Sequence, residues 1–179
     1  MAPEVRSEIV QTLENSRQEL NAAVESVSDS QATASPGAGR WSVLECLEHI
    51  AAVEERFLRR LELAERTAAP RSDKQREAEL AGLVTDRKQR AEAPEPVRPA
   101  GRFTSLAQAL EHFNAVRTRT IQFAEERAED LYSLAADHPR FGSRNGLEML
   151  LIISGHSQRH AEQIREARAA VAKSSQLHP

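Results

Sequence analysis

The 179-residue chain has few aromatic residues, a single cysteine and no long hydrophobic run. Aromatic residues make up 4% of the sequence and the net charge is −3, so neither stacking rings nor a basic surface indicates a nucleic-acid partner. Because Cys46 is the one cysteine, a disulfide within the chain is excluded. No apolar run reaches the roughly 18 to 20 residues of a membrane span, and residues 1–20 lack the apolar core of a signal peptide. We therefore expect a cytoplasmic protein that binds neither nucleic acid nor a membrane.

Strand signals are also absent, since there are no alternating runs of Val, Ile and Thr and no Asn-Gly turn between apolar segments. Hydrophobic residues, 40% of the total, instead recur at helical spacing. Four long segments show this spacing: residues 3–27, a segment that starts at about Ser42, residues 105–127 and residues 145–172. Loops are expected at 28–40 and 131–144, where Ser, Gly and Pro interrupt the pattern. The sequence therefore predicts one all-α domain over residues 1–179, a four-helix bundle of the up-down-down-up type.

Capping motifs indicate where the helices begin. They are Ser42 with Glu45, Ser105 with Gln108, and Asn145 with Glu148. Trp41, just before the first of these motifs, is placed to pack on Cys46. Residues 68–103 are charged and proline-containing, and we expect a crossing there with a short helix over about 73–90. Residues 173–179 are expected to form a frayed tail.

Two histidines lie four residues apart in the last predicted helix. His156 and His160 stand one turn apart on a face that also carries Met149, Ile153 and Ile164. Buried imidazoles need polar partners, and one metal ion would satisfy both. Histidines are also common as ordinary core or surface residues, so the pair alone leaves both interpretations open. His49, in a helix expected to face this one, is a candidate third ligand.

Two motifs give the chain a family resemblance. Residues 41–49 read W-S-x-x-E-x-L-x-H and residues 156–164 read H-x-x-R-H-x-x-Q-I. With these motifs the chain resembles the DinB-like superfamily of four-helix-bundle proteins, over nearly its whole length except the charged crossing. The resemblance implies a divalent-metal site at the matching positions His49, His156 and His160. Zinc or nickel is the expected ion, with iron or manganese as alternatives.

The resemblance also implies two classes of function. Relatives include transferases that use low-molecular-weight thiols such as bacillithiol or mycothiol, and three protein ligands leave a metal ion an open position for water or a thiol. The first expectation is therefore a metal-dependent hydrolase or thiol S-transferase that acts on a small molecule. The alternative is a non-enzymatic metal-binding or scaffold module of a stress response. A homodimer is expected in either case, because bundle helices often leave an apolar stripe uncovered.

The remaining polar residues receive more ordinary interpretations, and no catalytic residue is assigned. Glu45 is expected to act as a cap partner and not as a base, and Arg159 as a member of an ion pair. Gln163 either hydrogen-bonds near the ion or ends the polar layer. The other candidates are Cys46 as a buried apolar residue, His112 as a structural or exposed residue, His138 as part of a turn, and His178 as part of the tail.

Overall fold

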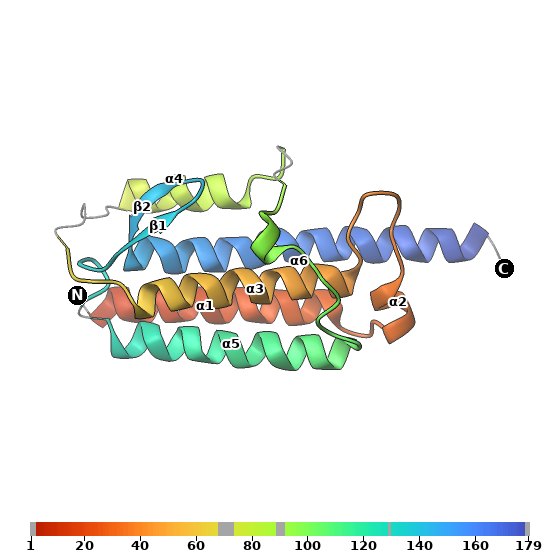
Figure 1. Cartoon of the computed structure of the whole chain (residues 1–179), viewed down its shortest axis with the longest axis horizontal. Coiled ribbons are helices and arrows are strands. Elements are labelled where there is room, and N and C mark those ends of the chain that lie inside the picture. The colour runs from red at the N-terminus through yellow and green to blue at the C-terminus, as the bar shows by residue number, and fades with distance from the viewer. Residues whose placement is uncertain (1–2, 68–73, 89–91, 129, 178–179) are drawn as a thin grey trace.

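Four long helices make up most of the computed structural model, which describes residues 3–67, 74–88, 92–128 and 130–177. These helices are α1 (Pro3–Val24), α3 (Val43–Glu62), α5 (Leu106–Glu126) and α6 (Gly146–Leu177). Figure 1 shows that α1 and α6 run in one direction and α3 and α5 in the other. The predicted up-down-down-up bundle is confirmed.

The bundle has α5 and α6 between α1 and α3. Helix α1 packs against α5 and α6, and α3 packs against the same two helices. The segment that joins α1 to α3 therefore connects antiparallel helices at opposite corners of the bundle. The candidate site lies where α3 meets α6.

The predicted helix starts are present as hydrogen-bonded caps. The Ser42 hydroxyl accepts from the Glu45 amide at 3.2 Å, and the Glu45 carboxylate accepts from the Ser42 amide at 2.7 Å. Asn145 and Glu148 make the same reciprocal pair at 2.9 and 3.0 Å. Because each pair satisfies two amides that a helix start leaves without partners, the sequence signal and the structure coincide.

Two predicted loops contain regular structure. A short helix, α2 (Asp29–Thr33), lies in the first and is capped by Ser28 and Gln31. The second holds an antiparallel hairpin of β1 (Ala135–His138) and β2 (Gly142–Asn145), so the prediction that no strand forms is wrong here. Gly142 has a φ of +72°, which only glycine adopts freely, and with Pro139 it closes a tight turn. Strands of four residues are too short for an alternating pattern to reveal.

The charged crossing covers the α3–α6 side of the bundle. It contains α4 (Lys74–Thr85), which packs on α6, and the 3-10 helix η1 (Glu95–Val97), which packs on α3. Gly155 allows α4 to approach closely, because a Cβ there would lie 3.0 Å from Cγ1 of Val84. The predicted short helix is thus confirmed in a shorter form, while residues 68–73 and 89–91 of the crossing lie outside the described residues.

Helix α6 is longer than the sequence suggested. It continues to Leu177, so the tail that was expected to fray from residue 173 is helical over its described part. Residues 178–179 lie outside the described chain, and the prediction for His178 falls there. In Figure 1 the end of α6 projects beyond the other bundle helices.

A buried arginine joins all four bundle helices. Arg117 of α5 donates to the Glu54 carboxylate of α3 at 2.7 and 2.8 Å. It also donates to the Leu13 carbonyl and the Ser16 hydroxyl of α1 at 2.7 and 2.6 Å, and to the Ser157 hydroxyl of α6 at 2.8 Å. Ser157 follows His156, so this network fixes α6 beside the candidate site.

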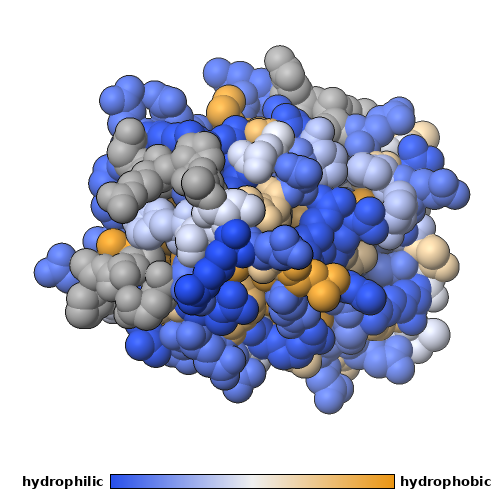
Figure 2. Space-filling model, turned by 60° about the vertical axis from the view of Figure 1, so that its left-hand side comes forward, coloured by the Kyte–Doolittle hydropathy of each residue, from blue (hydrophilic) through white to orange (hydrophobic). Residues whose placement is uncertain are grey.

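The surface carries few large apolar side chains. The face drawn in Figure 2 is mostly hydrophilic, with hydrophobic residues in small separate groups. Among the described residues, the large hydrophobic side chains that are exposed are Leu63 and Leu83, which lie on different segments. None of the helices in the described part of the chain combines the length and the apolar character of a membrane span. The expected homodimer stays a prediction.

Candidate metal centre

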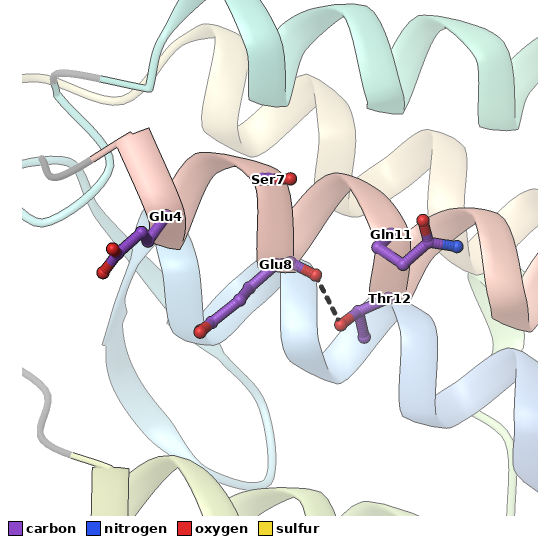
Figure 3. A pocket seen from close by; sticks show the side chains of 5 residues that line it. All are labelled: Glu4, Ser7, Glu8, Gln11 and Thr12. Atoms are coloured by element: carbon purple, nitrogen blue, oxygen red, sulfur yellow. Dashed lines mark hydrogen bonds between the residues drawn. The ribbon is translucent and has the colours of Figure 1, made fainter.

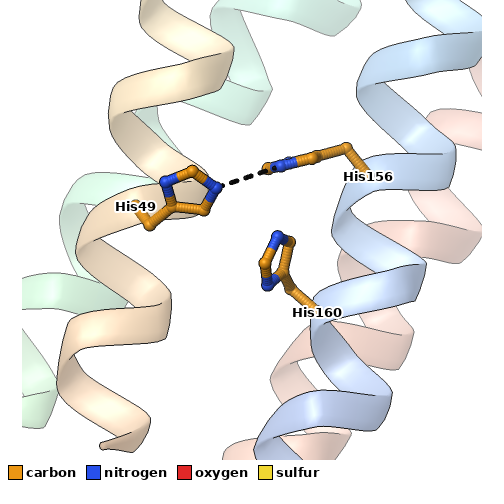
Figure 4. A group of neighbouring side chains, drawn as sticks. All are labelled: His49, His156 and His160. Carbon is orange, nitrogen blue, oxygen red and sulfur yellow. Dashed lines mark hydrogen bonds between the residues drawn. The ribbon is translucent and has the colours of Figure 1, made fainter. Parts of the chain in front are cut away.

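The structure brings the three predicted histidines together. His49 extends from α3, and His156 and His160 extend from successive turns of α6. One ring nitrogen of each lies within 4.8 Å of the other two, and Figure 4 shows the rings facing one another. Nε2 of His49 and Nε2 of His156 are 3.2 Å apart. The cluster therefore joins two helices, and its members His49 and His156 are 107 residues apart in sequence.

Burial keeps these imidazoles uncharged. His49 and His160 are 5% and 7% exposed. Loss of hydration lowers the pKa of His49, and it lowers the pKa of His160 to about 3, with the nearby His49 adding to the effect. Burial and the two neighbouring histidines bring the pKa of His156 well below its usual range. Neutral imidazole is the form that binds metal ions, so the site is ready for an ion at neutral pH.

A backbone carbonyl sets the proton position of His49. Nδ1 of His49 lies 2.7 Å from the carbonyl oxygen of Val97 in η1. A carbonyl only accepts hydrogen bonds, so Nδ1 donates and neutral His49 keeps the lone pair on Nε2, the atom that faces His156. This contact could not be predicted, because Val97 belongs to the crossing, which lacks hydrophobic periodicity.

The crossing is itself held in place by a buried carboxylate. Glu48, 6% exposed, accepts hydrogen bonds from three successive backbone amides. The donors are Ala100 at 2.6 Å, Gly101 at 3.2 Å and Arg102 at 3.1 Å. Glu48 precedes His49, so one turn of α3 both supplies a histidine of the cluster and fixes the segment that orients it.

Trp41 packs against two rings of the cluster. Its ring centroid lies 4.8 Å from that of His49 and 6.4 Å from that of His160. The residue was expected to pack near Cys46 as part of the helix start. Its contact with two imidazoles, tilted against His49 and stacked on His160, adds a role in the site that helix-capping rules do not reveal.

The three histidines line a cleft of about 1510 Å³. Apolar walls come from Val53, Phe57, Ile152 and Phe141, and Gln163 also lies on the lining. A second depression, of about 690 Å³, lies on α1, and Figure 3 shows its five polar side chains. All five come from one helix, and two of them already have partners: the Thr12 hydroxyl donates to the Glu8 carbonyl, and the Glu8 carboxylate pairs with Lys74 of α4. The cleft at the histidines is therefore the candidate site.

Comparison with known proteins decides the family. The sequence profile of the DinB superfamily matches residues 12–164. The chain belongs to the DinB superfamily. The uncharacterized protein YuaE of Bacillus subtilis (strain 168) is 23% identical over 145 residues, which cover 81% of this chain and 88% of YuaE. The predicted family is confirmed.

A solved structure shows the same fold. YfiT from Bacillus subtilis is described as a probable metal-dependent hydrolase with an unusual four-helix bundle topology. It superposes with a TM-score of 0.58 and 20% sequence identity, over 93% of this DinB-superfamily chain and 87% of YfiT. At this identity the likeness establishes the shared fold.

The donor set of the DinB-superfamily protein fits a divalent metal ion. Two nitrogens bound to one tetrahedral ion at about 2.1 Å are roughly 3.4 Å apart, close to the 3.2 Å between His49 and His156. Nδ1 of His160 is buried without a hydrogen-bond partner. Such an atom is costly to bury, and it indicates that the cluster is incomplete without a further group.

The other candidates have the ordinary roles that the sequence indicated. Glu45 is the cap partner of Ser42 and does not line the cleft. Cys46 is fully buried, and burial raises the pKa of its thiol to about 12, so it is inert. His112 is half-buried and lies 2.7 Å from Glu55. His138 accepts from two amides of the hairpin turn, although its ring also lines the cleft.

Arg159 connects α6 to the end of α4. Its side chain donates to the backbone carbonyl of Asp86 at the end of α4 and lines the cleft. The surface or interhelical ion pair expected of it stays a prediction. A cleft-lining arginine next to His160 bears on which molecules the site accepts.

Proposed function

We propose that this DinB-superfamily protein holds one divalent metal ion with His49, His156 and His160 and acts on a small molecule, as a hydrolase or a thiol S-transferase. The observation that carries the proposal is the convergence of three neutral imidazoles, from two helices, on a cleft large enough for a substrate. The similar fold of YfiT, described as a probable metal-dependent hydrolase, supports it.

Three protein ligands leave at least one coordination position open, which is typical of catalytic metal sites. An ion bound there would lower the pKa of a water or thiol ligand and so supply a nucleophile near neutral pH. Imidazole donors suit several first-row metals. Zinc or nickel is our first assignment, with iron or manganese as alternatives.

The chain's own residues orient and shield this position. Val97 holds His49 in the tautomer that directs Nε2 to the cluster, and Trp41 covers one side of the rings. Val53 and Phe57 form an apolar wall that restricts water. The lining carboxylates of the described residues are already in ion pairs, Glu166 with Arg87 at 2.6 Å and Glu92 with Arg98 at 3.8 Å. We therefore assign no separate general base.

That lack of a separate base favours one alternative, a module that binds metal without catalysis. In such a protein the ion would stabilise the bundle and the cleft would serve binding. A thiol substrate needs no added base beyond the ion, so the transferase remains compatible with the same lining.

Metal content and turnover test the proposal together. Purified protein is expected to hold about one equivalent of zinc or nickel by elemental analysis, and His156→Gln is expected to lower metal affinity by at least about 100-fold. His112→Gln, a histidine outside the cleft, is the matched control and is expected to keep it. Hydrolysis of an ester and lactone panel, and thiol transfer to electrophiles, should disappear with chelator and in His156→Gln. Metal binding without turnover would support the binding module, and absence of metal binding would refute both.

A further inference from the structure

The cleft above the histidines is strongly basic. Its described lining contains six arginines and two glutamates, although the protein as a whole has a net charge of −3. The arginines are Arg40, Arg56, Arg87, Arg98, Arg140 and Arg159. Positive charge concentrated in a concave surface attracts anions. The basic lining of an otherwise acidic protein therefore indicates an anionic ligand.

Three of these six arginines have no carboxylate partner among the residues that the structure describes. The two lining glutamates are paired with Arg87 and Arg98. Within the described residues, no ion pair involves Arg40, Arg56 or Arg140. These three guanidinium groups are therefore available to a ligand.

Two of the three, Arg56 and Arg140, line the cleft next to residues of one stack of aromatic rings. The guanidinium of Arg140, in the hairpin turn, lies 5.3 Å from the centroid of Phe141. Phe141 packs on His138 at 4.7 Å, and His138 stacks on Phe57 at 4.9 Å. Phe57 is the next residue after Arg56, so a stack of rings connects the hairpin to the turn of α3 that carries Arg56.

The separation between Arg56 and the histidines is one that a small substrate could span. Arg56 follows His49 by seven residues, about two helical turns or roughly 10 Å along α3. Phe57 and Phe141 offer an apolar surface on the lining of the same cleft. A small molecule with an apolar body could place one end at each site.

Like charges around this cleft act on one another. Arg87, Arg140 and Arg159 line the same cleft, so their positive charges repel one another there. An anion in the cleft would relieve this repulsion and would itself be held by charge-assisted hydrogen bonds.

We propose that the substrate carries a carboxylate or phosphate group, which Arg56 and Arg140 bind at the hairpin end of the cleft while its reactive end faces the three histidines. The proposal rests on the function proposed above and specifies its substrate class as small anionic molecules. Guanidinium groups bind either anion through paired hydrogen bonds, which a lysine does not provide.

Binding of simple probes tests this without turnover. Benzylphosphonate and phenylacetate are titrated by calorimetry into the full-length protein, zinc-loaded and metal-free, with uncharged phenylacetamide as the reference. Both acids are expected to bind at least about tenfold more tightly than the amide, since each charge-assisted pair contributes on the order of a tenfold factor. Arg56→Gln and Arg140→Gln are each expected to weaken the acids about tenfold and to leave the amide unchanged.

Arg59→Gln is the matched control, because Arg59 is an exposed arginine on α3, three residues from Arg56 and outside the cleft. It is expected to change nothing. A stronger response to the phosphonate would assign phosphate as the natural group, and a stronger response to phenylacetate would assign carboxylate. Equal binding of acids and amide, or acid binding that survives both replacements, overturns the proposal. If zinc does not bind, the metal-free titration still decides the anion site, so the two proposals fail separately.

Discussion

Arg117 shows how much a single residue contributes to this bundle. It is the largest of the fully buried side chains among the described residues. Its guanidinium hydrogen-bonds to Glu54, to two groups of α1 and to Ser157. The interior is therefore held at its centre by a polar network as well as by apolar packing, and every donor of that network has to be satisfied.

Replacement of Arg117 is predicted to be severely destabilising. Arg117→Met fills part of the space but leaves the buried Glu54 carboxylate with one partner among the described residues, the Thr120 hydroxyl 2.8 Å away. Removal of one member of a buried ion pair typically costs about 3–5 kcal/mol of unfolding free energy. Urea denaturation at pH 7.5 measures this loss.

Arg119→Met supplies the control for Arg117. Arg119 is on the same helix but exposed, with Glu62 at 3.6 Å, and the loss there is expected to stay below about 1 kcal/mol. Similar losses in the two variants would show that the buried network contributes no more than a surface ion pair.

The sequence predicted the three histidines but not Arg117. His156 and His160 have a four-residue spacing that marks one helix face, and His49 completes a motif shared with the DinB superfamily. Arg117 stands beside Val116 in a helix whose apolar residues already account for its periodicity. Periodicity identifies buried positions from apolar side chains, so a charged residue that finds all its partners in the core gives no signal.

At the scale of elements, the helix starts were predictable and the crossing was not. Reciprocal caps such as Ser42 with Glu45 are local, so a four-residue window contains the whole interaction. The contact between Val97 and His49 joins residues 48 apart and depends on a backbone oxygen, which every residue possesses. The identity of the side chain at position 97 therefore does not predict this contact.

Glu48 is predicted to control metal affinity through the crossing. Glu48→Gln keeps the side-chain shape but replaces a carboxylate oxygen with an amide group that cannot accept from the amides of residues 100–102. A looser crossing holds Val97 and therefore the His49 ring less firmly. Metal affinity is expected to fall about 10- to 100-fold, as for other groups that orient metal ligands. Competition with a chromophoric chelator measures it.

Glu45→Gln is the matched control for Glu48. Glu45 is three residues away on the same helix, and glutamine at its position retains the capping box. Metal affinity is expected to be unchanged there. A fall in affinity of the same size in both variants would contradict a specific role for Glu48.

At the scale of the whole molecule, the site depends on the topology. The up-down-down-up arrangement places α3 and α6 side by side although α5 intervenes in sequence, and the crossing from α3 to α5 then covers their shared groove. The charges of the cleft come from the loop before α3, from α3 and α6, and from the hairpin and the crossing. In each segment alone, the charged residues look like those of an ordinary solvent-exposed surface. The basic cleft forms only when the segments pack together.

The buried histidines also make the stability of the whole fold depend on pH. A histidine with a pKa of about 3 in the folded state and about 6.5 in the unfolded state takes up a proton only on unfolding across that interval. Acid therefore favours the unfolded chain: the free energy of unfolding falls as pH drops below 6.5 and stops falling below 3. For His160 alone the loss at pH 5.5 is about 1.4 kcal/mol. His138, with its pKa lowered to about 4, acts in the same direction.

Urea denaturation of metal-free protein at pH 8.5, 7.5 and 5.5 is the test. The free energy of unfolding is expected to change little between pH 8.5 and 7.5, because the histidines are neutral in both the folded and the unfolded state there. A clear loss of stability is expected at pH 5.5. His160→Gln should remove about 1.4 kcal/mol of the loss between pH 7.5 and 5.5, whatever it does to stability at pH 7.5. An unchanged loss in that variant would mean that His160 already takes up its proton in the folded protein. Protons would then compete with a metal ion for His160 near neutral pH. Burial could no longer explain why the three imidazoles are neutral and able to bind metal.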